Sequence, residues 1–154
     1  MPENTYNSVM DNDHVSGSEN RVKIYSPTQV ACGTIGGPVG LIYFLHSNFS
    51  TLGNDRLKKN TIIYGSLFLF VLIIALPFLP DEIPSTPFTI LYIITARLIA
   101  EKYQMTKSAI IDSDNFEFQS NWRVLLFGLL CLIGSVLIIV GPLFILAMFG
   151  IWEP

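Results

Sequence analysis

The stretch that decides the fold is residues 26–45, SPTQVACGTIGGPVGLIYFL. It opens with the signals of a helix start, because Ser26 can cap, Pro27 suits the first helical position and Gln29 completes a capping box. The stretch then runs apolar, although it contains four glycines and an internal proline. In water each interior glycine costs a helix roughly 1 kcal/mol relative to alanine. The pattern therefore favours a bilayer, where glycine lets neighbouring helices pack closely.

The small residues of this stretch fall on one side of a helical wheel at about 100° per residue. They form a predicted helix-packing face that consists of Cys32, Gly33, Gly36, Gly37 and Gly40. Three explanations of this face remain open: a close contact within the chain, a self-association surface, or the lining of a ligand site. Glycine does not distinguish them, because all three require close approach of the backbone.

The overall composition also indicates a membrane protein. Of the 154 residues, 51% are hydrophobic and 14% are charged, whereas an ordinary soluble domain has about 25% charged residues. The formal net charge of −3 gives no reason to expect a nucleic-acid partner. Cys32 and Cys131 lie in apolar runs without the spacing of a disulfide framework or a metal site, so we expect no cofactor.

Hydropathy predicts an all-α integral membrane bundle of four hydrophobic helices, at about 26–46, 61–79, 86–107 and 123–149. Residues 26–154 are expected to form a single transmembrane domain. Residues 1–25 are rich in Asn, Ser, Asp and Glu, which predicts a disordered tail.

The third helix is short and becomes polar at its end. Arg97 interrupts its apolar run, and Glu101 and Lys102 follow shortly afterwards. One alternative is that the helix continues through Gln104 or Lys107; the other is that it stops part-way as a re-entrant or interfacial piece. We favour the first, because nothing between residues 88 and 108 breaks a helix.

Arg97 is a predicted charge at membrane depth, and Glu101 is correctly spaced to pair with it on the same helix. We expect this pair to face the bundle rather than lipid. It is either a structural ion pair or part of a polar cavity.

The distribution of cations predicts an orientation. If four helices cross, one side holds six Lys and Arg residues and the other holds only Arg21 and Lys23. The six are Arg56, Lys58, Lys59, Lys102, Lys107 and Arg123. The positive-inside rule then predicts that both termini lie outside.

Several short motifs resemble those of a group of small, uncharacterised multi-pass membrane proteins of bacteria. They are Tyr25-Ser26-Pro27-x-Gln29, Gly36-Gly37-Pro38, Asn48-Phe49, Leu52-Gly53-Asn54 and Ser120-Asn121-Trp122-Arg123. The resemblance covers roughly residues 24–125. It implies a location in the bacterial cytoplasmic (inner) membrane, and it implies no activity or catalytic residue.

The spans contain no Ser/His/Asp set, no His-x-x-x-His and no phosphate-binding glycine loop, so we do not expect an enzyme. We predict a non-enzymatic membrane protein that acts through helix packing with itself or with a membrane partner, as accessory or immunity-type subunits do. Its surroundings are then the lipid bilayer, a second copy or another membrane protein. The alternative is an oligomeric pathway for a small solute or an ion, with Arg97 in its lining.

Overall fold

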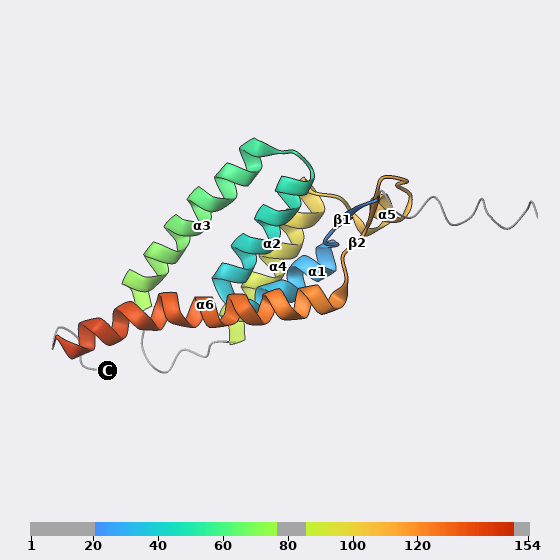
Figure 1. Cartoon of the computed structure of the whole chain (residues 1–154). Coiled ribbons are helices and arrows are strands. Elements are labelled where there is room, and N and C mark those ends of the chain that lie inside the picture. The colour runs from blue at the N-terminus through green and yellow to red at the C-terminus, as the bar shows by residue number, and fades with distance from the viewer. Residues whose placement is uncertain (1–20, 77–85, 150–154) are drawn as a thin grey trace, which may run out of the picture.

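The computed structural model describes residues 21–76 and 86–149, which are mostly helical (Figure 1). The elements in chain order are β1 (Val22–Ile24), α1 (Pro27–Gly33), the 3-10 helix η1 (Thr34–Gly36), α2 (Gly37–Thr51), α3 (Asp55–Ala75), α4 (Thr86–Tyr103), α5 (Lys107–Ile111), β2 (Phe116–Phe118) and α6 (Asn121–Met148). The first 20 residues of the predicted tail and the predicted end of the second helix, after Leu76, lie outside the described residues.

The first predicted helix does not continue as one rod. It begins as expected, with both hydrogen bonds of the capping box between Ser26 and Gln29. After Gly33 the chain tightens into η1, and Gly37 then adopts a φ of 77°. This left-handed conformation favours glycine and cannot belong to a continuous α-helix. The prediction of a single helix over 26–46 is therefore wrong.

Beyond Gly37 the chain reverses, and α2 returns alongside α1 as a helical hairpin. The backbone N–H of Tyr25 donates to the Asn48 side chain at 2.9 Å, and the rings of Tyr25 and Phe44 meet edge to face at 4.9 Å. Nearer the turn, Gly33 lies against both Phe44 and Gly40. These contacts pair residues that are roughly symmetric about Gly36 and Gly37, so the turn of the hairpin lies at the predicted Gly-Gly-Pro motif.

Three helical stretches are long and apolar enough to cross a membrane: Pro27–Thr51, Asp55–Ala75 and Asn121–Ile145. The first of these is the hairpin. The other two belong to α3 and α6, which expose large apolar side chains along much of their length, and no residue of α3 is buried. Such extended apolar surface is unfavourable in water and suits a bilayer. The chain is therefore a helical membrane protein.

Three helix boundaries differ from the predicted ones. The second helix begins at Asp55, six residues earlier than expected, because the Asn54 side chain caps it. The third ends at Tyr103 and does not continue to Lys107, since Thr106 caps the separate helix α5. The last begins at Asn121 rather than at residue 123.

The fold is mostly helical, as the all-α prediction requires, and it includes one small two-stranded sheet that was not predicted. β1 and β2 pair in parallel, with Val22 opposite Phe116 and Ile24 opposite Phe118. Ile24 and Tyr25 are buried. The predicted disordered tail therefore extends too far into the chain, because residues 22–25 have a defined structure.

The hydrophobic core lies where the hairpin meets α4 and α6. Its buried residues are Tyr25, Val30, Phe44, Leu45, Phe49, Ala96, Ala100 and Val124. Figure 1 shows α6 running beside α1, while α3 lies on the far side of α2. The hairpin is thus the central element around which the longer helices are arranged.

Candidate functional site

Two glycines of the predicted packing face serve the contact between the two arms of the hairpin. Gly33 lies directly against the ring of Phe44. A Cβ atom on Gly40 would come within 2.5 Å of the carbonyl oxygen of Gly33. Side chains at these positions would force α1 and α2 apart.

The other two glycines face α6. A Cβ atom on Gly36 would lie 2.5 Å from the carbonyl oxygen of Gly128 and 3.0 Å from the Cβ of Cys131. A Cβ atom on Gly37 would lie 2.8 Å from the Oγ of Ser135. The structure therefore places the glycines in contacts within the chain, divided between two neighbours rather than on one continuous face.

Cys32 differs from the glycines with which it was grouped. It is exposed, whereas Cys131 is buried in α6. The helical wheel requires one straight helix over these residues, and the reversal at Gly37 excludes it. Cys32 instead lines a groove between α1 and α6.

Ser135 fastens the turn of the hairpin to α6. Its hydroxyl donates to the carbonyl of Gly36 at 2.7 Å and accepts from the N–H of Val39 at 3.3 Å. The side chain is buried. The break between η1 and α2 frees these backbone groups from helical bonding, and in an apolar environment they need another partner. The Ser135 hydroxyl is the hydrogen-bond partner of both backbone groups.

Asn48 is the centre of a second polar contact, at the opposite end of the hairpin. Its side chain is almost completely buried and bonds to both backbone groups of Tyr25. It also donates to the side chain of Gln104 at 2.8 Å, and Gln104 in turn donates to the carbonyl of Leu45 at 3.2 Å. Asn48 therefore joins α2 to the residues that directly follow β1 and α4.

Gln29 makes the third polar contact, between the starts of α1 and α6. Its amide nitrogen donates to the carbonyl of Gln119 at 2.6 Å and to the side chain of Asn121 at 2.8 Å. From the sequence, Gln29 was expected only as a capping residue and Asn48 only as part of a short motif, and no hydrogen bond was predicted for Asn48 or Ser135. The available signal was an uncharged polar residue within an apolar helix, which marks contacts between membrane helices.

Tyr25 lies just before α1, outside the membrane-spanning stretches, and its ring is buried. Burial, together with the neighbouring Tyr43, raises the pKa of Tyr25 to about 12. The phenol is therefore neutral throughout the physiological range and belongs to the packed core.

Arg97 and Glu101 form the predicted ion pair on α4, with the Arg97 Nε 2.8 Å from a Glu101 carboxylate oxygen. The expectation that they face the bundle is wrong, because their side chains are 60% and 41% exposed. Ala96 and Ala100 occupy the inner face of α4 and are fully buried. Successive residues of a helix are about 100° apart, so Arg97 and Glu101, which follow these alanines, point outward.

Two open, mostly apolar grooves occur in the part of the chain that the structure describes. The first, of about 610 Å³, lies between α1 and α6; the second, of about 400 Å³, lies between α2, α3 and α4. Neither is lined by Arg97. Within residues 21–76 and 86–149, no three His, Cys, Asp or Glu residues are grouped so that they could hold a metal ion.

Comparison of the chain with protein-family models, with curated proteins and with solved structures finds no significant match.

Proposed function

We propose that the protein is a non-enzymatic integral membrane protein that acts by associating with a second copy through the outer face of α4. The single observation that carries this proposal is the Arg97–Glu101 ion pair on the outside of a helix within an apolar bundle. Arg97 lies six residues before the end of α4, about 9 Å along the helix. Ionisable residues inside a membrane normally face other protein groups. In a single chain this pair lies on the outer surface of the bundle.

A second copy is well suited to cover the pair. Each copy presents one positive and one negative side chain on the same face, so two faces related by a two-fold axis are complementary. Arg97 of one copy then faces Glu101 of the other as well as its own. The exposed apolar side chains of Leu91, Ile94 and Leu98 adjoin the pair on α4 and supply the rest of the contact.

The arrangement in the membrane follows from the positions of the cations. Eight of the nine Lys and Arg residues lie in or beside β1, at the start of α3, at the end of α4, in α5 and at the start of α6, and the ninth is Arg97. Figure 1 shows these parts of the elements toward the end of the molecule that carries the sheet. Residues 77–85 and 150–154 contain none. The positive-inside rule therefore favours the sheet end as the cytoplasmic end.

With this orientation α3, α4 and α6 cross, and the hairpin enters the membrane and returns to the same side. The start of β1 then lies in the cytoplasm and the end of α6 lies outside. This arrangement replaces the prediction that both termini lie outside, which assumed four crossings. The assignment to a bacterial cytoplasmic membrane rests on the motif resemblance alone.

The orientation is tested with single-cysteine variants in a background that lacks Cys32 and Cys131. Val22→Cys and Arg56→Cys flank the hairpin, and both positions are exposed. A membrane-impermeant maleimide should label both from the same side of oriented vesicles. Labelling from opposite sides would show that residues 27–51 cross the membrane once.

Self-association is tested with the full-length protein in nanodiscs and in mild detergent, by native mass spectrometry. The wild type should be a dimer, and Arg97→Leu should weaken dimerisation at least tenfold by leaving two Glu101 carboxylates unpaired. Leu67→Ala, at an exposed position of α3, is the matched control and should leave the dimer intact.

Two results would contradict the proposal. One is a wild type that remains monomeric in nanodiscs. The other is an Arg97→Leu variant that dimerises as strongly as the wild type. A larger wild-type oligomer, together with an ion flux in proteoliposomes that Arg97→Leu abolishes, would favour the pathway alternative. In that case Arg97→Leu combined with Glu101→Leu should be stable yet inactive.

A further inference from the structure

We propose that the groove between α1 and α6 binds one acyl chain of a membrane phospholipid, with the lipid headgroup at Thr28 and Asn121. This inference does not depend on the self-association proposed above, since the groove and the outer face of α4 share no residue.

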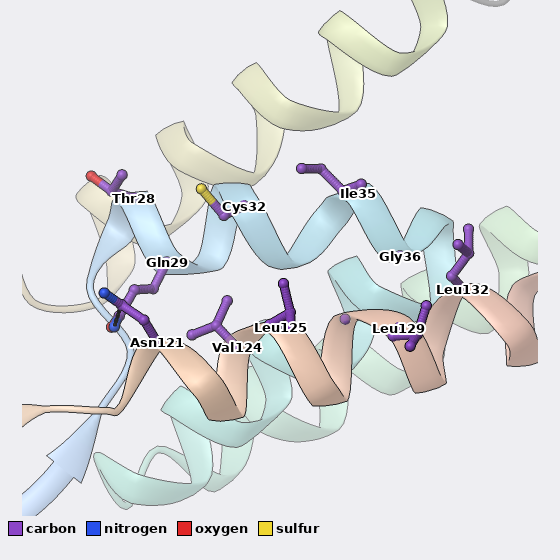
Figure 2. A pocket seen from close by; sticks show the side chains of 11 residues that line it. Thr28, Gln29, Cys32, Ile35, Gly36, Asn121, Val124, Leu125, Leu129 and Leu132 are labelled. Atoms are coloured by element: carbon purple, nitrogen blue, oxygen red, sulfur yellow. Dashed lines mark hydrogen bonds between the residues drawn. The ribbon is translucent and has the colours of Figure 1, made fainter.

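The groove is formed where α1 and α6 run side by side (Figure 2). Its volume of about 610 Å³ lies within the range of about 300–1,000 Å³ typical of ligand sites. Gly36 and Gly128 also line the groove, and the backbones of the hairpin and α6 are in close contact there. Its apolar lining consists of Cys32, Ile35, Val124, Leu125, Leu129 and Leu132.

The length of the groove matches one leaflet of a bilayer. From Asn121 to Leu132 the α6 backbone rises about 16 Å. The hydrocarbon core of a bilayer is about 30 Å thick, so one leaflet accounts for about 15 Å. An acyl chain that follows α6 from Asn121 would therefore end near Leu132, where the lining also ends.

The polarity of the groove changes along its length. Thr28, Gln29 and Asn121 lie at one end, and apolar residues line the rest (Figure 2). The Gln29 amide already donates to Gln119 and Asn121. Among the described residues, the Thr28 hydroxyl and the Asn121 amide nitrogen make no hydrogen bond. Both are donors, and the phosphate oxygens of a phospholipid headgroup are acceptors.

The two unpaired donors favour a lipid over a partner helix as the occupant. A partner helix offers an acceptor at the level of Thr28 and Asn121 only through particular residues, whereas every phospholipid carries phosphate oxygens at the headgroup level. A lipid headgroup lies at the level of the helix starts, and Trp122, which is exposed beside Asn121, is a residue type enriched at that level. The single polar end and the leaflet-length apolar channel thus fit an amphiphile.

The test uses the full-length protein released from nanodiscs that contain phosphatidylglycerol and phosphatidylethanolamine. Native mass spectrometry should detect one phospholipid retained per chain. Cys32→Trp fills the groove from an exposed position and should reduce the lipid-bound fraction at least tenfold. Leu130→Trp is the matched control, because Leu130 is exposed on α6 and does not line the groove.

A second variant tests the headgroup contact. Thr28→Val keeps the shape of the side chain and removes its donor, so it should lower retention of phospholipid while leaving retention of a diacylglycerol with the same chains unchanged. Circular dichroism spectra that match the wild type would show that each variant is folded.

Three outcomes would overturn the inference. They are equal lipid retention by Cys32→Trp and wild type, equal loss in Leu130→Trp, and a loss of dimer mass in Cys32→Trp without a loss of lipid. The last would assign the groove to a second copy. Because the same spectra report the mass of the dimer, failure of this inference is distinguishable from failure of the proposed self-association.

Discussion

Gly36 and Gly128 face each other across the contact between the hairpin and α6, yet only one of the two positions should be destabilised by alanine. A Cβ on Gly36 points at the Gly128 carbonyl oxygen, at 2.5 Å, and this backbone atom cannot move without shifting α6. A Cβ on Gly128 has a nearest neighbour at 4.0 Å, the carbonyl oxygen of Gly33. Only the first substitution therefore produces a steric clash.

The expected magnitudes follow from this geometry. Gly36 has φ −65° and ψ 9°, which alanine adopts readily, so the cost of Gly36→Ala is steric rather than conformational. Overpacking of this kind destabilises by about 1–3 kcal/mol. Gly128 lies inside α6, where alanine is the better helix former by up to about 1 kcal/mol. Gly128→Ala should therefore be neutral or stabilising.

The two variants are compared by unfolding in mixed micelles of sodium dodecyl sulfate and dodecyl maltoside, followed by circular dichroism. The free energy of unfolding should be lower for Gly36→Ala than for Gly128→Ala by at least about 1 kcal/mol. A difference below about 0.5 kcal/mol would refute the close contact at the turn of the hairpin.

Three further predictions use the same unfolding assay. Asn48→Leu leaves both backbone groups of Tyr25 unpaired. Each unpaired group costs about 1–3 kcal/mol, so the variant should be destabilised by about 2–6 kcal/mol. Asn115→Leu, at an exposed position, is the control and should have little effect. Ser135→Ala removes two hydrogen bonds from the turn of the hairpin and should destabilise by about 2 kcal/mol or more; Ser66→Ala, at an exposed position of α3, should not. The pKa of Tyr25 is about 12 in the folded protein and about 10 in the unfolded chain. The neutral phenol therefore stabilises the fold fully below about pH 10, and this contribution should be lost as the pH rises from about 10 to 12. In Tyr25→Phe this part of the pH dependence should be absent; an unchanged alkaline profile would contradict the assignment.

The local signals of the sequence were informative where neighbouring residues decide the structure. The cap at Ser26 and the ion-pair spacing of Arg97 and Glu101 both depend on residues three or four positions apart, and both interactions occur as expected. The apolar length of α3 and α6 likewise depends on composition alone. Such features require no knowledge of the rest of the fold.

The hairpin could not be predicted in this way, because the spacing of its glycines is also that of a straight packing face. What distinguishes the two is the left-handed φ of Gly37, which the sequence permits but does not require. The direction of Arg97 depends on which face of α4 packs into the core, and that face is the one with Ala96 and Ala100. The pairing of β1 with β2 joins three-residue strands from distant parts of the chain, so no local pattern marks it.

The hydrogen bonds of Ser135 also have a consequence for the order of folding. The hydroxyl that completes the turn at Gly36 lies 99 residues later in the chain. At a synthesis rate of about 5–20 residues per second, the turn is made about 5–20 s before its partner. During that interval the nascent hairpin has a free carbonyl at its tip. The hydrogen bonds at the tip of the hairpin therefore form late, after α6 has been inserted.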